Sequence, residues 1–164
     1  MDVVHRAWMV EEASRYCLAA ELLAAHPNLH RQAQINAALS IEMLLKSFIS
    51  QSDQHEGEVY ETYKSKRGHD LKKLANKLPI EVCSRFGISQ SKDGIPTTKS
   101  RRLIERYANT FIEDRYIYES PKSEVRPGYS PEFIKLARTL INYTIDIYIE
   151  TGCTDPWVSK YKSV

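Results

Sequence analysis

Apolar residues along this chain recur at the spacing of α-helices, and no stretch alternates cleanly enough to predict an amphipathic strand. The first helix is expected from about Val3 to Ala25, and Pro27 ends it. The spacing of three or four residues between its apolar positions indicates one buried side and one wetter side. These apolar positions are Val4, Ala7, Trp8, Ala13, Cys17, Ala20 and Ala24.

A second helix is expected from about Leu29 to Gln51, and its middle is apolar almost all round. The segment 37–49 reads AALSIEMLLKSFI, which is typical of a helix that is buried on most sides or shared between a core and a partner surface. Glu42 and Lys46 interrupt this segment at an i, i+4 spacing, so they share one face of the helix. Because charges among apolar residues cost free energy unless they are paired, we expect an ion pair here.

The chain then turns polar from Gln51 to Gly68, where a short helical turn is expected around Val59 to Tyr63. His69 and Asp70 follow and open a short third helix, because either side chain can take the N-terminal capping position. Pro79 ends this helix.

A turn-rich connector over residues 90–96 leads to a fourth helix that is expected from about Thr98 to Tyr118. The segment Ser120–Pro131 holds three of the seven prolines and is predicted to be a loop. Ser130 is a typical helix cap, and the proline that follows it suits the first helical position, so a last helix is expected from there to about Thr151. The remaining tail is expected to be docked or frayed.

These elements predict an all-α fold, a helical bundle of four longer helices plus a short one. Residues 1–164 are expected to form a single domain, with a core over about residues 3–151 and a short C-terminal extension over residues 152–164. With 42% hydrophobic and 27% charged residues, the composition is that of a globular chain and excludes wholesale disorder.

Composition also bears on where the protein works. The longest apolar run is far shorter than the ~20 residues of a membrane span, and no signal peptide is visible at the start, so we expect no membrane association. The three cysteines are too few and too far apart for a disulfide framework or a zinc knuckle. A reducing, cytoplasmic location is therefore expected.

The net charge of +2 is too small to imply nucleic-acid binding, but the charges are unevenly distributed. Two basic clusters could meet in space as a surface that attracts anions, although two solvated helix faces are the commoner arrangement. The first cluster contains Lys64, Lys66, Arg67, Lys72, Lys73 and Lys77, and the second contains Lys99, Arg101, Arg102 and Arg106.

Several kinds of catalytic chemistry lack the residues they need. The six glycines are scattered, so neither a phosphate-binding loop nor a dinucleotide-binding turn is predicted. No HExxH pattern occurs, and Pro27 separates His26 from His30, so neither a metal site nor a cofactor is expected. His69 is the one histidine in an interesting context, at a helix start beside Arg67, where it either helps to attract an anion or merely caps and packs.

Three segments in order, AALSIEMLLKSFI, GHDLKKLANKL and ERYANTFIEDRYIYE, together with a long first helix and a hydrophobic last one, resemble the HEPN domain (higher eukaryotes and prokaryotes nucleotide-binding). The resemblance covers about Val3 to Thr151. Many HEPN domains are metal-independent endoribonucleases with an arginine and a histidine four to six residues apart. This chain has no such pair, and no histidine follows Arg115. Other HEPN domains without the pair are binding or dimerisation modules, and that branch fits better.

The resemblance therefore implies a non-catalytic binding module that forms a homodimer and binds a nucleotide or RNA. It also implies a nucleotidyltransferase partner or a role in a defence or toxin–antitoxin system. The expected groove residues, chosen partly from the resemblance, are Glu42, Lys46, Arg67, His69, Asp70, Arg115 and Tyr116.

Two alternatives stay open at this point. One is a metal-independent endoribonuclease with a non-standard active site, in which His69 acts as acid and base and Arg67 and Arg115 stabilise the phosphorane charge. The other is a helical scaffold or immunity partner that binds protein alone, for which apolar surface on the second helix would suffice.

Overall fold

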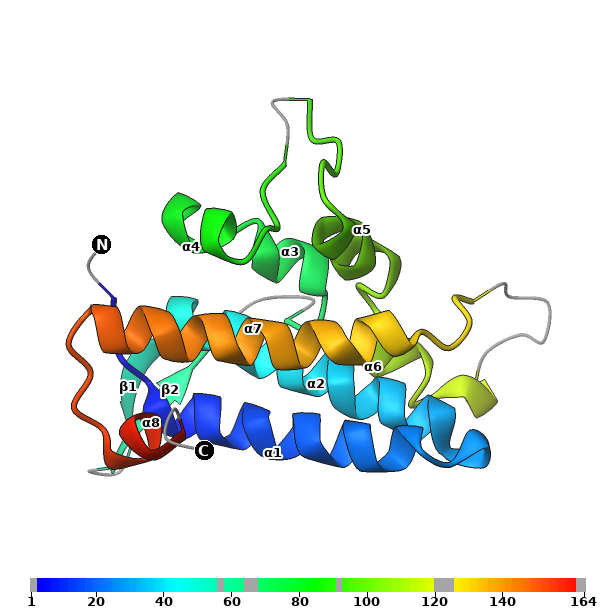
Figure 1. Ribbon diagram of the computed structural model, residues 1–164, viewed down its shortest axis with the longest axis horizontal. Helices are drawn as coiled ribbons and strands as arrows, with labels where there is room; N and C mark the ends of the chain where they lie inside the picture. Colours follow the sequence, from blue (N-terminus) through cyan, green and yellow to red (C-terminus); the bar gives the residue numbers. More distant parts are fainter. Residues whose placement is uncertain (1–2, 56–57, 64–67, 91–92, 120–125, 162–164) are drawn as a thin grey trace.

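The computed structural model describes residues 3–55, 58–63, 68–90, 93–119 and 126–161, and it confirms the expected all-α bundle. Three long helices form the main layer (Figure 1). They are α1 (Ala7–Ala24), α2 (His30–Ile49) and α7 (Pro131–Glu150), and α2 contacts both of the others. Their bounds agree with the predicted helices to within four residues, because the spacing of apolar residues fixes long helices well.

The ends of the long helices follow from local chemistry. The 3₁₀ turn η1 (Pro27–Leu29) separates α1 from α2. At the start of α7 the Ser130 side chain accepts a hydrogen bond from the backbone N–H of Phe133 at 3.2 Å, as the capping pattern predicted. The first helix begins at Ala7 rather than near Val3, and the segment before it is irregular.

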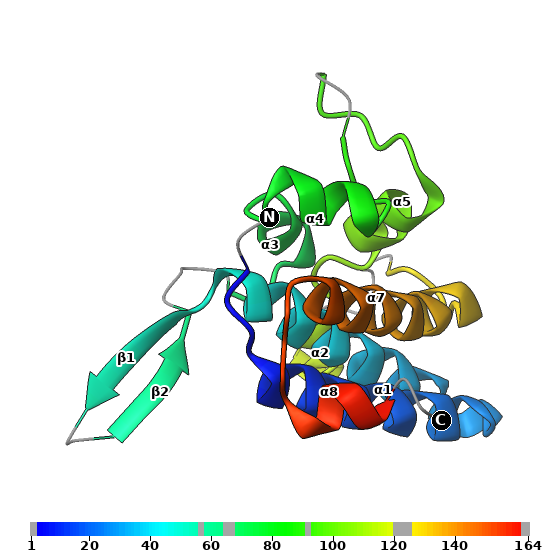
Figure 2. The same ribbon diagram turned by 60° about the vertical axis from the view of Figure 1, so that its left-hand side comes forward.

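The polar stretch after α2 contains a hairpin, which the sequence analysis missed. The strands β1 (Gln51–His55) and β2 (Glu58–Thr62) pair antiparallel, so the predicted helical turn around Val59 to Tyr63 is wrong. Figure 2 shows the hairpin projecting from the bundle. The sequence of this hairpin is largely polar and lacks the alternation of apolar and polar residues by which a half-buried strand is recognised.

The predicted third and fourth helices are both shorter than expected. The third covers only α3 (Leu71–Ala75), and α4 (Ile80–Arg85) follows after Pro79. The fourth is broken into α5 (Lys99–Arg106), α6 (Thr110–Glu113) and the 3₁₀ turn η2 (Ile117–Glu119).

The physical reason for the break lies at Ala108. Its carbonyl accepts a hydrogen bond from the backbone N–H of Leu71 at 2.9 Å and so binds the first residue of α3. The same contact ties α3 to the segment after α5, and α3, α4 and α5 form a second layer that Figure 1 shows above the long helices. The tail is docked: it forms α8 (Pro156–Tyr161), whose Val158 is buried in the core.

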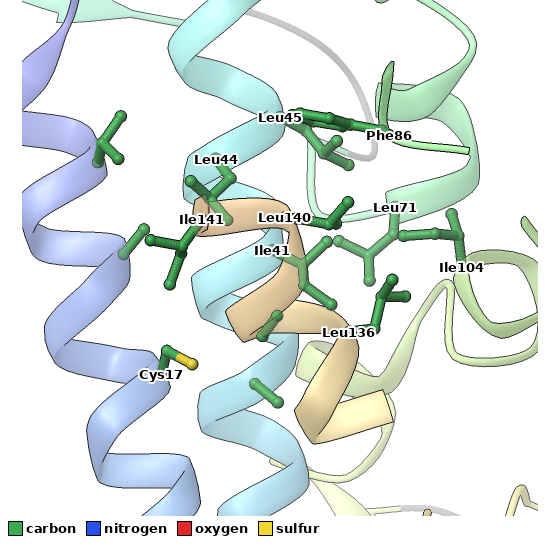
Figure 3. Packing of buried hydrophobic residues seen from close by; sticks show 14 of the residues in the cluster. Cys17, Ile41, Leu44, Leu45, Leu71, Phe86, Ile104, Leu136, Leu140 and Ile141 are labelled. Carbon is green, nitrogen blue, oxygen red and sulfur yellow. The ribbon is translucent and has the colours of Figure 1, made fainter. Parts of the chain in front are cut away.

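The core is centred on α2. Figure 3 shows Ile41 and Leu45 of this helix on the side of the short helices, and Leu44 beside Ile141 of α7. On the other side α1 contributes mostly alanines, which let the two helices approach closely enough for the Ser40 hydroxyl to donate to the Ala13 carbonyl at 2.7 Å. The apolar segment of α2 is therefore buried on most sides, which is one of the two alternatives that its pattern left open.

Two buried arginines hold distant segments together. Arg6 donates to the carbonyls of Ser47 at 2.8 Å and Ser50 at 2.5 Å, and so satisfies the C-terminal end of α2. Arg101 is almost fully buried and bonds to Glu105 at 2.9 Å and Asn76 at 2.5 Å. The sequence analysis placed Arg101 in a basic surface cluster, and its burial shows that it does not belong to one.

Replacement of Arg101 by methionine is expected to lower the free energy of unfolding by about 2–4 kcal/mol, because it strands the polar partners of a buried charge. The neighbouring Arg102 is exposed, so Arg102→Met is the matched control and should change this free energy by less than about 0.5 kcal/mol. Urea unfolding followed by circular dichroism measures both. Equal losses in the two variants would show that Arg101 is not a structural cross-link.

Candidate functional site

The buried Glu42 carboxylate contacts side chains from two segments, α2 and the turn before α3. Its side chain is only 4% exposed. Lys46 Nζ donates to its Oε1 at 2.6 Å, which confirms the predicted ion pair along α2. His69 Nδ1 lies 3.0 Å from both carboxylate oxygens, and because a carboxylate only accepts, the imidazole N–H donates. Two residues 27 positions apart in the chain are thus joined at one acid.

The position of His69 follows from the residue after it. Of the two predicted capping residues, Asp70 performs this role, since its Oδ1 accepts from the backbone N–H of Lys73 at 3.0 Å. His69 is therefore not needed as a cap and turns towards α2. Its side chain remains 44% exposed, so the imidazole is held on one side and open to solvent on the other.

Aromatic rings extend the site towards α6. The Phe111 ring lies 5.0 Å from the His69 ring, centroid to centroid. The guanidinium carbon of Arg115 lies 5.4 Å from the Phe111 centroid and 5.1 Å from that of Tyr116. The Phe111 ring thus lies between His69 and Arg115, and Arg115 and Tyr116 were both predicted groove residues.

A second ring lies on the other side of Lys46. Lys46 Nζ is 5.4 Å and Lys77 Nζ is 5.0 Å from the Tyr63 ring centroid, and Lys77 also donates to the Tyr63 hydroxyl at 2.8 Å. Tyr63 was not predicted as a site residue, and the only sequence signal for it is an aromatic residue among lysines. Arg67, the remaining predicted groove residue, lies outside the described residues.

These contacts define one surface, called here the His69 cluster. It consists of Glu42, Lys46, Tyr63, His69, Lys77, Phe111, Arg115 and Tyr116. The cluster combines three permanent cations with one buried carboxylate and several ring faces. Cations attract phosphates, and aromatic rings stack on bases. An imidazole held by a carboxylate can also move a proton at its free nitrogen.

A second region was not predicted at all. A surface cleft of about 530 Å³ is lined by η1, the start of α2 and residues 126–129. In it the His30 and Tyr129 rings stack 3.8 Å apart at 8°. Asp114 lines the same cleft, and burial raises the pKa of its carboxyl, although a hydrogen bond from Gln34 and the charges of Arg31 and Arg126 lower it in part.

Two of the three cysteines are not nucleophiles of the usual kind. Cys17 is fully buried on α1, and burial raises the pKa of its thiol to about 12. The pKa of Cys83 is also raised, again mainly by burial. Because the thiolate is the reactive form, neither side chain is primed for covalent chemistry.

Within the described ranges, no three side chains of the histidine, cysteine, aspartate and glutamate types gather as metal ligands would. In the same part of the chain, no helix has both the length and the apolar character that crossing a membrane requires. Comparison with protein families, curated proteins and solved structures finds no match for this chain.

The raised pKa of Asp114 gives a test of the cleft. Its carboxyl binds a proton more tightly in the folded chain, so ionisation opposes folding at pH values above the folded-state pKa. Asp114→Asn is therefore expected to have a higher melting temperature than the unsubstituted protein at pH 7. The difference should disappear at a pH below the ordinary aspartate pKa, where both chains are neutral at this position. A less stable variant at pH 7 would show that Arg31 and Arg126 outweigh burial.

Proposed function

We propose that this protein is a HEPN-like binding module whose His69 cluster binds the phosphates and bases of single-stranded RNA or of a free nucleotide. The observation that carries the proposal is that Arg115 lies on the rings of both Phe111 and Tyr116 beside His69. A guanidinium held on aromatic faces keeps its N–H donors directed outward, where they can bind phosphate oxygens.

The electrostatic arrangement supports an anionic ligand. Lys77 and Arg115 are exposed, and Lys46 is held by Glu42, so the acid nearest to the cations is buried and already bonded. Asp70 is also bonded, as the cap of α3. A phosphate that approaches the cluster therefore meets exposed cations rather than a free carboxylate.

The rings support recognition of bases. Tyr63 and Tyr116 are both half-buried, and each lies against a cation, at either side of the cluster. Base stacking on aromatic side chains tolerates any sequence, because every base has a flat face. The proposed ligand class is therefore defined by its phosphate and its base and not by a particular sequence.

The expected homodimer, nucleotidyltransferase partner and defence or toxin–antitoxin role belong to the same proposal. They are supported by the resemblance of the chain to HEPN domains, which also places Glu42, His69 and Arg115 in segments that carry that resemblance. The absence of an arginine–histidine pair supports binding in preference to cleavage.

Arg115→Ala and Lys77→Ala are each expected to weaken binding of a fluorescent single-stranded oligoribonucleotide by about tenfold, since each removes a phosphate contact and a ring partner. Fluorescence anisotropy measures the affinity, and Arg102→Ala, at an exposed arginine on α5, is the matched control. Competition by adenosine monophosphate distinguishes a nucleotide site from an RNA site. Equal affinity in all three variants would remove the His69 cluster as the binding surface.

One observation favours a second function, metal-independent endoribonuclease activity. The buried Glu42 carboxylate orients the His69 imidazole, an arrangement that general acid–base catalysis uses. If this function holds, RNA is cleaved in the presence of EDTA, and both His69→Ala and Glu42→Gln reduce the rate by at least about a hundredfold. Gel analysis of the products decides, and intact RNA with the unsubstituted protein contradicts the enzyme. Protein that neither binds nor cleaves RNA would favour the scaffold alternative.

A further inference from the structure

The outer face of α1 is apolar at both ends and charged in the middle. Trp8 is 55%, Leu18 is 52% and Leu22 is 64% exposed, which is unusual for three large apolar residues on one helix. Glu11 and Arg15 lie between them. The buried residues Val10, Ala13, Cys17 and Ala20 occupy the opposite face and pack into the core.

The spacing of these residues is that of a coiled-coil seam. Residues 8, 11, 15, 18 and 22 are separated by alternating steps of three and four, so they form one stripe along the helix. At 100° per residue the stripe spans less than a quarter of the helix surface. Such a seam is the surface that a second helix covers. The helices α2 and α7 both pack on the other side of α1 (Figures 1 and 2). Residues 152–155, before α8, border the stripe at Trp8.

The stripe is also self-complementary about position 13. When the direction of the helix is reversed about position 13, the place of Trp8 is taken by Leu18 and the place of Glu11 by Arg15. The place of Leu22 is taken by Val4, an exposed residue just before the helix. An antiparallel copy of the same helix would therefore set apolar residues against apolar residues and each glutamate against an arginine. The seam has two kinds of position, one at residues 8, 15 and 22 and the other at residues 11 and 18. In an antiparallel pair of helices, positions of the first kind face positions of the second kind, and the pairs named above meet this condition.

We propose that a second copy of this chain docks antiparallel on the α1 face, with Trp8 against Leu18 of the second copy and Glu11 against Arg15 of the second copy. The interface is isologous, since the same patch serves on both subunits. The inference rests on the proposed homodimer for its stoichiometry but not on RNA binding, because it uses no residue of the His69 cluster.

The charged centre fixes the register. In one chain Arg15 bonds to Glu11 at 2.7 Å and to Glu12, so its charge is shared between two carboxylates. Glu12 lies beside the stripe and keeps Arg15 in place, which leaves Glu11 to pair across the interface. A shift along the seam sets Glu11 or Arg15 against Trp8 or Leu18, and a charge against an apolar residue is costly once water is excluded.

The choice of a second copy over another partner follows from this symmetry. The stripe complements an antiparallel copy of itself in both charge and apolar character, and a helix of a different protein has no reason to show the same pattern. The face also lies on the side of the bundle away from α3, α4 and α5 in both views, so two chains could pair without covering the short-helix layer (Figures 1 and 2).

Charge reversal tests the interface directly by analytical ultracentrifugation over a dilution series. The unsubstituted protein is expected to sediment as a dimer of two 18.9 kDa chains. Glu11→Arg and Arg15→Glu each set like charges against one another, so each should raise the dimer dissociation constant by at least about a hundredfold. Leu18→Asp should do the same, whereas Ile80→Asp, at an exposed apolar residue of α4, is the matched control and should not.

Mixing the two charge variants separates an interface from a folding effect. Glu11→Arg has two arginines at the seam centre and Arg15→Glu has two glutamates, so together they form a complementary pair. An equimolar mixture is expected to recover the dimer that neither variant forms alone. A monomer at every concentration of the unsubstituted protein overturns both the proposed homodimer and this face. A dimer unaffected by the three α1 variants overturns this face alone, and neither result bears on RNA binding.

Discussion

The acid on α2 is the constraint around which the rest of the molecule is arranged. Glu42 lies on the helix that forms the centre of the core, where an unpaired carboxylate would cost several kcal/mol. Two partners satisfy it, Lys46 from its own helix and His69 from the layer above. The layer of short helices is therefore attached to α2 by a polar contact as well as by apolar packing, and the polar contact determines where His69 lies.

The two sides of α2 differ in their chemistry. Below α2, the alanines of α1 permit close helix packing, and the buried polar groups Ser40 and Arg6 bond to backbone carbonyls. Above it, polar side chains and rings gather at the edge between α2, α3 and α6. The two proposed surfaces lie accordingly: the ligand surface where helices meet through polar groups, and the self-association surface on the free face of α1.

Local patterns predicted what depends on near neighbours in the chain, and long-range contacts determined the rest. The spacing of Glu42 and Lys46 was sufficient to predict their ion pair, and Ser130 predicted the start of α7. The break after α5 could not be predicted, because it depends on a hydrogen bond between Leu71 and Ala108, which are distant in sequence. Arg101 looked like a surface charge for the same reason, since the atoms that bury it come from other elements.

The shortness of α3 and α6 has a consequence for how the His69 cluster behaves. Helices of four or five residues do not persist without tertiary contacts, because nucleation is unfavourable at that length. The cluster therefore exists only while these segments are docked on α2, and local opening of the short helices would separate its residues. A ligand that bridges His69 and Arg115 would bind the docked state alone and so would protect the amide hydrogens of the short helices from exchange with solvent.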